Sequence, residues 1–83
     1  MRVFERTFTS IRANLDFDDR LLDDADRRRE GSIRFWEARA HAVVLGRSCG
    51  ESGLALPAER RSSGGGTVLV GPGCLCYTIA LPL

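Results

Sequence analysis

The sequence predicts an α+β fold: a mixed, mainly antiparallel sheet with one covering helix. Three observations predict this class. Between residues 10 and 29, apolar side chains recur at three- and four-residue spacings, as in an amphipathic helix. The rest of the chain contains short apolar runs of strand length, most of them bounded by glycine, proline or serine. With 83 residues, the chain forms one small domain at most.

The first third of the chain predicts a short strand followed by the helix. Residues 3–8 alternate apolar and polar side chains, which favours a strand. Thr9 or Ser10 can cap a helix that runs to about Arg29, where basic side chains suit the C-terminal end of the helix dipole. Gly31 is the expected stop. The expected buried face carries Ile11, Leu15, Leu22 and Ala25.

Two hairpins are predicted after the helix. Residues 32–37 and 41–45 have the pattern of strands, and the three-residue link between them has hairpin length. Residues 67–70 and 74–81 form the second predicted pair, around a Gly-Pro-Gly turn.

The segments around these hairpins complete the predicted sheet. Residues 51–59 show little periodicity and are predicted to be a loop, and residues 60–62 a short strand. Leu75 and Tyr77 are expected to fill the sheet interior, and Trp36 is expected in the core.

Composition argues against several kinds of function. The net charge of +1 lacks the basic excess of a nucleic-acid-binding protein. No apolar run approaches the roughly 20 residues that span a bilayer, and no signal-peptide pattern is present, so we expect a cytoplasmic protein without a membrane partner. The odd set Cys49, Cys74 and Cys76 fits no standard zinc spacing, so we expect reduced thiols and no metal site. All twelve basic residues are arginine.

The segment from Arg60 to Gly66 reads Arg-Arg-Ser-Ser-Gly-Gly-Gly and gives the strongest chemical signal. One or two glycines supply the positive φ of a turn, so three in a row remove more Cβ atoms than a turn needs. Bare backbone lets amide N–H groups approach an anion, and a neighbouring arginine offers a planar cation for phosphate or carboxylate. Taken alone, the same residues also fit a flexible hairpin loop with a solvated arginine pair.

Four blocks occur in an order that is more specific than any one of them. Residues 14–22 are similar to N-L-x-x-D-x-x-L-L, and residues 33–48 contain R-F-W followed by V-x-x-G-R-S. Residues 60–68 are similar to R-R-x-S-G-G-G-x-V, and residues 73–77 to G-x-L-x-Y. In this order the blocks resemble the lipoate–protein ligase A family.

The resemblance implies a biotin/lipoate A/B protein ligase catalytic domain, whose fold is shared with biotin ligases and octanoyltransferases. Such ligases convert lipoate or octanoate, with ATP and Mg²⁺, to an acyl-adenylate. They then pass the acyl group to a lysine of a lipoyl domain, as in 2-oxo acid dehydrogenase E2 or the glycine cleavage H protein. By position, the substrate-binding residues would be Arg61, Ser63, Gly64, Gly65 and Gly66, flanked by Gly46 and Arg47.

The chain also departs from the family pattern. The family's reactive lysine, and the cysteine of octanoyltransferases, would lie downstream of residue 83, and this chain has no lysine, so no catalytic residue is assigned. Cys76 stands where the family often has Asn. We therefore expect residues 1–83 to be a truncated N-terminal portion of a single catalytic domain, inactive alone. The alternatives are a non-catalytic paralogue that only binds an acyl ligand or a partner, and an octanoyltransferase relative.

Overall fold

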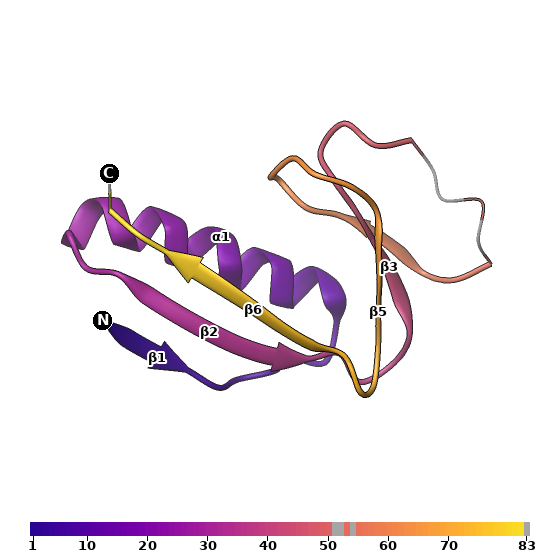
Figure 1. The fold of residues 1–83 in the computed structure, drawn as a ribbon, viewed down its shortest axis with the longest axis horizontal. Helices are drawn as coiled ribbons and strands as arrows, with labels where there is room; N and C mark the ends of the chain where they lie inside the picture. Colours follow the sequence, from indigo (N-terminus) through magenta and orange to yellow (C-terminus); the bar gives the residue numbers. More distant parts are fainter. Residues whose placement is uncertain (51–52, 54, 83) are drawn as a thin grey trace.

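The computed structural model describes residues 1–50, 53 and 55–82, which form one helix and two small mixed sheets (Figure 1). The helix lies along one face of the first sheet, and the second sheet lies beyond the end of this layer. The predicted α+β class is confirmed. In chain order the elements are β1 (Arg2–Phe4), α1 (Ile11–Arg28), β2 (Ser32–Glu37), β3 (Ala42–Leu45), β4 (Ala58–Arg60), β5 (Val68–Val70) and β6 (Leu75–Ala80).

Each sheet combines one parallel and one antiparallel strand pair. In the first sheet, β2 is central, with β1 parallel and β6 antiparallel to it. In the second sheet, β3 is central, with β4 parallel and β5 antiparallel to it. Both predicted hairpins are therefore wrong, because each short link carries the chain from one sheet to the other. The link between β2 and β3 does not form the exposed turn of a hairpin. Ala38 in this link and Ala42 at the start of β3 are buried in the core between the sheets.

Three other predicted segments differ in extent. The first strand is Arg2–Phe4 rather than residues 3–8. The strand predicted at residues 60–62 lies two residues earlier, at Ala58–Arg60. Within the predicted loop 51–59, residues 51, 52 and 54 lie outside the described part, and the last two residues belong to that strand.

α1 begins at one of the two expected caps. The Ala13 amide donates a hydrogen bond of 3.1 Å to Ser10 Oγ, which satisfies a donor that the first helical turn leaves free. The helix ends at Arg28, close to the predicted end at about Arg29, but the capping residue is not Gly31. Arg29 itself adopts the left-handed conformation, with φ of 55°.

The buried face of α1 is rotated from the one that the apolar pattern predicts. Leu21 is buried, whereas Leu22 is 45% exposed. The reason is that two polar residues, Asn14 and Asp18, face the first sheet and hydrogen-bond to it. Polar side chains that are hydrogen-bonded can occupy a buried face. The positions of the apolar residues alone therefore do not predict which side of α1 is buried.

Side-chain alternation gives the first sheet two different faces. Arg34, Trp36 and Ala80 are buried on the side of the helix. The neighbouring positions point away from α1, so Leu75 is 65% and Tyr77 66% exposed, and the prediction that they fill the interior is wrong. Strand register brings the apolar residues of this side together, and we call them the outer face: Val3, Ile33, Phe35, Leu75, Tyr77 and Ile79.

The main core lies between the helix and both sheets. Leu15 of α1 packs in one cluster with Trp36, Val44 and Val70, which come from three different strands. A smaller cluster of Leu21, Ala25 and Ala80 fixes the other end of the helix on the first sheet. Trp36 lies in the core, as predicted. In the described part of the chain, no helix is long and apolar enough to cross a membrane.

Candidate functional site

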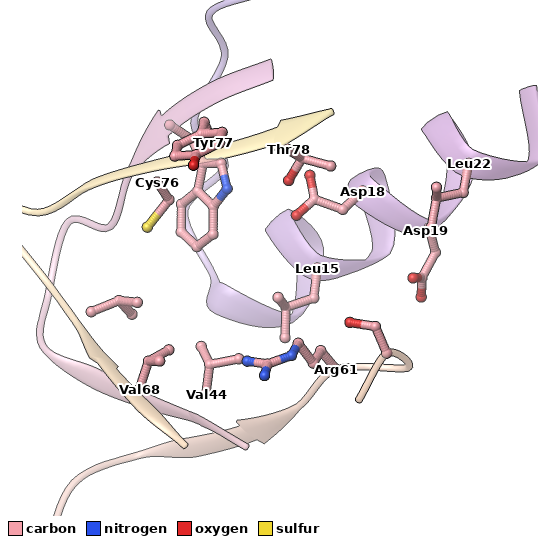
Figure 2. Close-up of a pocket in the computed structure, with 13 residues that line it drawn as sticks. Leu15, Asp18, Asp19, Leu22, Val44, Arg61, Val68, Cys76, Tyr77 and Thr78 are labelled. Atoms are coloured by element: carbon pink, nitrogen blue, oxygen red, sulfur yellow. The ribbon is translucent and has the colours of Figure 1, made fainter. Parts of the chain in front are cut away.

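A cavity of about 340 Å³ lies where α1 meets the two sheets (Figure 2). Its walls include the apolar side chains of Leu15, Val44 and Val68, which come from α1, β3 and β5. Polar groups enter from two sides. Arg61 and Ser63 belong to the segment between β4 and β5, and Asp18, Asp19 and Thr78 to the helix and β6.

The segment 61–67, called the glycine loop below, is fixed to the end of β3 by its backbone. Arg61 N donates to Leu45 O at 2.9 Å, and Arg47 N donates to Ser63 O at 2.8 Å. The Cys49 thiol donates to Gly65 O at 3.2 Å. The glycine loop is therefore held from behind by the turn that follows β3.

Two arginines complete this attachment. Arg60 Nη1 donates to the carbonyl oxygens of Gly46 and Cys49 and, at 3.2 Å, to that of Arg47. Arg61 turns the other way and binds its own loop. Its Nε and Nη2 donate to Gly64 O at 3.1 and 3.0 Å, and Nη2 also donates to Gly66 O at 2.8 Å. A guanidinium thus stands inside the curve of the glycine loop and lines the cavity.

Different features of the structure explain why glycine occupies some positions of this region. A Cβ at Gly46 would lie 2.2 Å from Gly65 O, so the close approach of the two segments requires glycine there. Gly65 has φ of 104°, which disfavours any side chain. At Gly64 and Gly66, a Cβ would meet nothing within 4 Å, and neither has a positive φ. The fold therefore explains Gly46 and Gly65, but not Gly64 and Gly66.

The glycine loop offers donors for an anion. Its carbonyl oxygens at Gly64 and Gly66 face Arg61, and the amides of Gly64, Gly65 and Gly66 donate to no other described residue. In a trans peptide the N–H points opposite to the preceding carbonyl, so the Gly65 amide points away from Arg61. The Arg61 guanidinium and the Gly64 and Gly66 amides remain as donors that suit a carboxylate or phosphate. Next to them the cavity wall is mainly apolar, so the arrangement can hold an apolar chain that ends in an anionic group.

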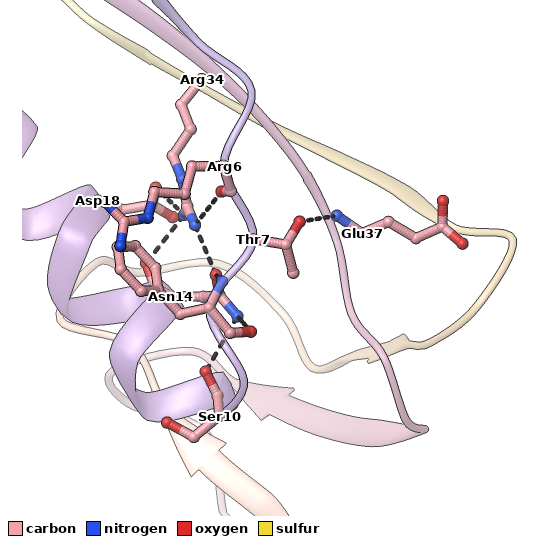
Figure 3. Close-up of polar contacts among 8 residues, drawn as sticks. Arg6, Thr7, Ser10, Asn14, Asp18, Arg34 and Glu37 are labelled. Atoms are coloured by element: carbon pink, nitrogen blue, oxygen red, sulfur yellow. Dashed lines mark hydrogen bonds and ion pairs between the residues drawn. The ribbon is translucent and has the colours of Figure 1, made fainter.

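A buried network holds the helix side of the cavity (Figure 3). Arg34 is 0% exposed, and its Nη1 donates to Asn14 O at 3.0 Å and to Asp18 Oδ1 at 2.9 Å. Its Nη2 donates to Arg6 O at 2.9 Å and to Asn14 Oδ1. The guanidinium carbon also lies 4.9 Å from the centre of the Phe17 ring. Arg34 thereby fixes Asp18, whose carboxylate lines the cavity and is balanced by this cation.

Cys76 lines the cavity from β6. Burial raises the pKa of its thiol to about 11, and the neighbouring Cys74 adds to the increase. The thiol is therefore neutral near pH 7, and it contributes a small apolar surface to the wall rather than a nucleophile.

The structure brings some of the sequence-predicted site residues together and leaves others apart. Arg61 and Ser63 line the cavity, and residues 64–66 continue the same loop. Gly46 and Arg47 lie behind the loop and contact its backbone, without lining the cavity. In the described ranges, no three His, Cys, Asp or Glu side chains are placed to share a metal ion.

Sequence reasoning missed the helix side of the cavity. Neither Asp18 nor Asp19 is among the site residues predicted from the sequence, yet both line the cavity. The available signal was the spacing within the N-L-x-x-D block, because Asn14 and Asp18 are four residues apart and share one helical face. Thr78 was missed because the direction of β6 side chains depends on pairing with β2, which the sequence does not reveal.

The fold and the cavity define a class: an α+β domain that pairs an apolar cavity with an arginine–glycine loop. Residues 10–83 match the lipoyl protein ligase A/B catalytic domain, and the chain therefore belongs to this family. Among solved structures, the chain is similar to the crystal structure of P. falciparum LipL1 in complex with lipoate, with a TM-score of 0.76 and 20% sequence identity. The match covers 94% of this chain and 29% of LipL1. No curated protein matches the chain.

Proposed function

We propose that this chain supplies the acyl-binding part of a lipoate–protein ligase-like, acyl-activating enzyme. The apolar part of lipoate or octanoate would lie along Leu15, Val44 and Val68, and its carboxyl end would meet the glycine loop. Arg61 and the free amides of the loop would stabilise the carboxylate and, after activation, the acyl phosphate. The lipoate complex of LipL1, a protein with the same fold, supports this choice of ligand.

The observation that carries the proposal is the pair of glycines that the fold does not require. A side chain at Gly64 or Gly66 would meet open space in the protein itself. Both residues flank Gly65, and their carbonyl oxygens accept hydrogen bonds from the Arg61 guanidinium, which lines the cavity. The space left by their missing Cβ atoms is therefore available to a ligand.

The family membership implies lipoyl-domain acceptors in general. For the whole protein, we propose ATP and Mg²⁺ as cosubstrates, and the lysine of a lipoyl domain in 2-oxo acid dehydrogenase E2 or in the glycine cleavage H protein as the acceptor. Of the groups described here, Arg61 and the glycine-loop amides fit the phosphate of an acyl-adenylate.

We also propose that residues 1–83 act as one portion of a larger catalytic domain. The chain spans 29% of LipL1, and its outer face exposes large apolar side chains such as Leu75 and Tyr77. Contiguous exposed apolar surface is uncommon in monomers and is typical of surfaces that another segment covers. A longer gene product, if one is found, should show these residues protected from hydrogen exchange and oxidation, and unchanged exposure in it would contradict the proposal.

Calorimetric titration tests the acyl-binding role. We expect the 83-residue chain to bind octanoate, lipoate and a non-hydrolysable lipoyl-adenylate analogue, the last one most tightly because it engages both the cavity and the loop. Gly64→Ala and Gly66→Ala should keep the melting temperature and weaken binding of the adenylate analogue. Gly50→Ala is the matched control, because a Cβ there also meets nothing within 4 Å and the residue lies outside the loop. Failure to bind any of the three ligands would refute the proposal.

A non-catalytic acyl-binding protein is the second candidate, because the described cavity offers groups that bind an acid, and its Cys76 thiol is neutral near pH 7. ATP–pyrophosphate exchange with lipoate separates the two candidates. Binding without exchange in the longest available gene product supports the non-catalytic protein, and exchange supports the ligase. Acyl transfer from octanoyl acyl carrier protein without ATP would instead identify an octanoyltransferase.

A further inference from the structure

We infer that Arg12 and Asp19 of α1 are positioning residues, which hold the glycine loop at a fixed distance from the helix and so set the width of the cavity. The consequence for binding rests on the proposed acyl-binding role. Arg12 Nη1 donates to Arg60 O at 2.9 Å, and Ser62 Oγ donates to Asp19 Oδ1 at 2.6 Å.

The two contacts join residues on one side of α1 to two residues of one short segment that begins at the end of β4. Arg12 and Asp19 are seven residues apart, which is about two helical turns, so they lie on the same side of α1. Their partners are Arg60, the last residue of β4, and Ser62, two residues further along the chain. Between them stands Arg61, whose guanidinium lines the cavity. The two contacts thus lie on either side in sequence of Arg61, the cation that lines the cavity.

Further groups orient Arg12. Its Nε donates to Asp16 Oδ1 at 3.2 Å, and its Nη1 lies 3.5 Å from Glu59 Oε1. The two carboxylates, one on the helix and one on β4, hold the guanidinium between the two segments. Arg12 therefore reaches Arg60 from a restrained position.

The opposite side of the loop has its own attachments. Backbone hydrogen bonds from Arg47 to Ser63 and from Arg61 to Leu45 join it to β3. Loss of the helix contacts would therefore leave the loop folded onto β3, while its distance from α1 would no longer be fixed. Because Asp19 and Arg61 line opposite parts of the same cavity, such a change would alter the cavity and leave the core clusters intact.

The test combines loop position, ligand affinity and stability. Asp19→Ala and Ser62→Ala each remove one side of the same hydrogen bond, and the double variant completes a cycle. Asp19→Asn keeps an oxygen acceptor and should restore the contact. Asp23→Ala is the matched control, since Asp23 is an exposed residue one turn further along α1. Amide chemical shifts of residues 61–66 report the loop, octanoate titration reports the affinity, and thermal unfolding reports the fold.

We expect Asp19→Ala and Ser62→Ala to shift the amides of residues 61–66 and to weaken octanoate binding by about threefold each, as expected for the loss of one exposed hydrogen bond. The double variant should be no weaker than either single variant, and Asp19→Asn and Asp23→Ala should resemble the wild type. Unchanged loop shifts in Asp19→Ala, or no rescue by Asp19→Asn, would overturn the inference. If the wild type does not bind octanoate, the proposed function fails, and the loop shifts alone still decide whether Asp19 positions the loop.

Discussion

Arginine side chains donate hydrogen bonds to backbone carbonyls in two regions of this molecule, one buried and one exposed. Arg34 is 0% exposed and donates to two backbone carbonyls, a side-chain amide and a carboxylate between α1 and the first sheet. Arg60 and Arg61 also donate to backbone carbonyls, but mainly at exposed positions around the glycine loop. The first cluster joins the layers of the fold, and the second shapes the rim of the cavity.

The difference in burial decides what each cluster contributes. A buried acceptor that loses its hydrogen-bond donor remains unsatisfied, and its desolvation then destabilises the fold. At an exposed carbonyl, a water molecule can replace the lost donor. The Arg34 cluster is therefore expected to dominate stability. The Arg60 and Arg61 cluster is expected to order a loop that can exchange some of its hydrogen bonds when an anion binds.

The largest effect is expected for Arg34→Met. This change leaves Asp18, Asn14 Oδ1 and the carbonyl of Arg6 without their donor, so we expect a loss of about 3–5 kcal/mol in the free energy of unfolding. A small domain has little more than this in total, so the variant should be largely unfolded at 25 °C by circular dichroism. Arg39→Met, at an exposed position, is the control and should unfold like the wild type. A folded Arg34→Met variant would remove the distinction between the two clusters.

Gly46→Ala tests how tightly the turn after β3 holds the glycine loop. Its Cβ would lie 2.2 Å from Gly65 O, so one segment must move, and we expect a loss of about 1–3 kcal/mol in urea unfolding. Hydrogen exchange at the amides of Arg47 and Arg61 should become faster, because these amides donate to Ser63 O and Leu45 O across the strained contact. Gly50→Ala should change neither quantity. Equal behaviour of the two variants would show that the close approach is not maintained in solution.

Arg60→Met applies the same substitution to the exposed cluster. Arg60 loses its hydrogen bonds to the carbonyls of Gly46, Arg47 and Cys49, but water can reach most of these oxygens. We therefore expect a loss of only about 1 kcal/mol, together with faster hydrogen exchange at the Arg61 amide, which donates to Leu45 O. The comparison with Arg34→Met under the same conditions measures the effect of burial directly. A loss as large as that of Arg34→Met would show that the loop is part of the stability core.

How much of this could be predicted from the sequence also differs between the two regions. The glycine loop stands out because its signal is local: three glycines after two arginines and two serines. The Arg34 cluster joins residues that are 16 to 28 positions apart, so its partners become visible only when α1 lies on the sheet. Side-chain polarity is misleading there, because a charged strand residue is the most buried charge in the described part of the chain.

The strand pairing shows the same limit. Residues 32–37 and 41–45 have strand pattern and hairpin spacing, and both are strands, but each belongs to a different sheet. A short link between two strands fits a hairpin and a crossing between sheets equally well. Only the burial of Ala38 between the layers decides, and that depends on packing with residues from α1, β2, β3 and β5.

The smallest effect concerns Cys76, whose thiol lies on the cavity wall between the two clusters. With a pKa of about 11 instead of 9.0, it should hold about a hundredfold less thiolate at pH 8 than an ordinary thiol, and alkylation by iodoacetamide should be correspondingly slow.

The matched measurement follows each cysteine peptide by mass spectrometry, in buffer and in urea. Unfolding should remove the protection of Cys76, and octanoate should increase it if the acid fills the cavity. Because the folded state has the higher pKa, the neutral thiol contributes stability below pH 9, and this contribution is lost as the pH rises through about 11. Rapid alkylation of Cys76 in the folded chain at pH 8 would show that the cavity is open to solvent, and that the exposed arginine cluster does not hold its rim in place.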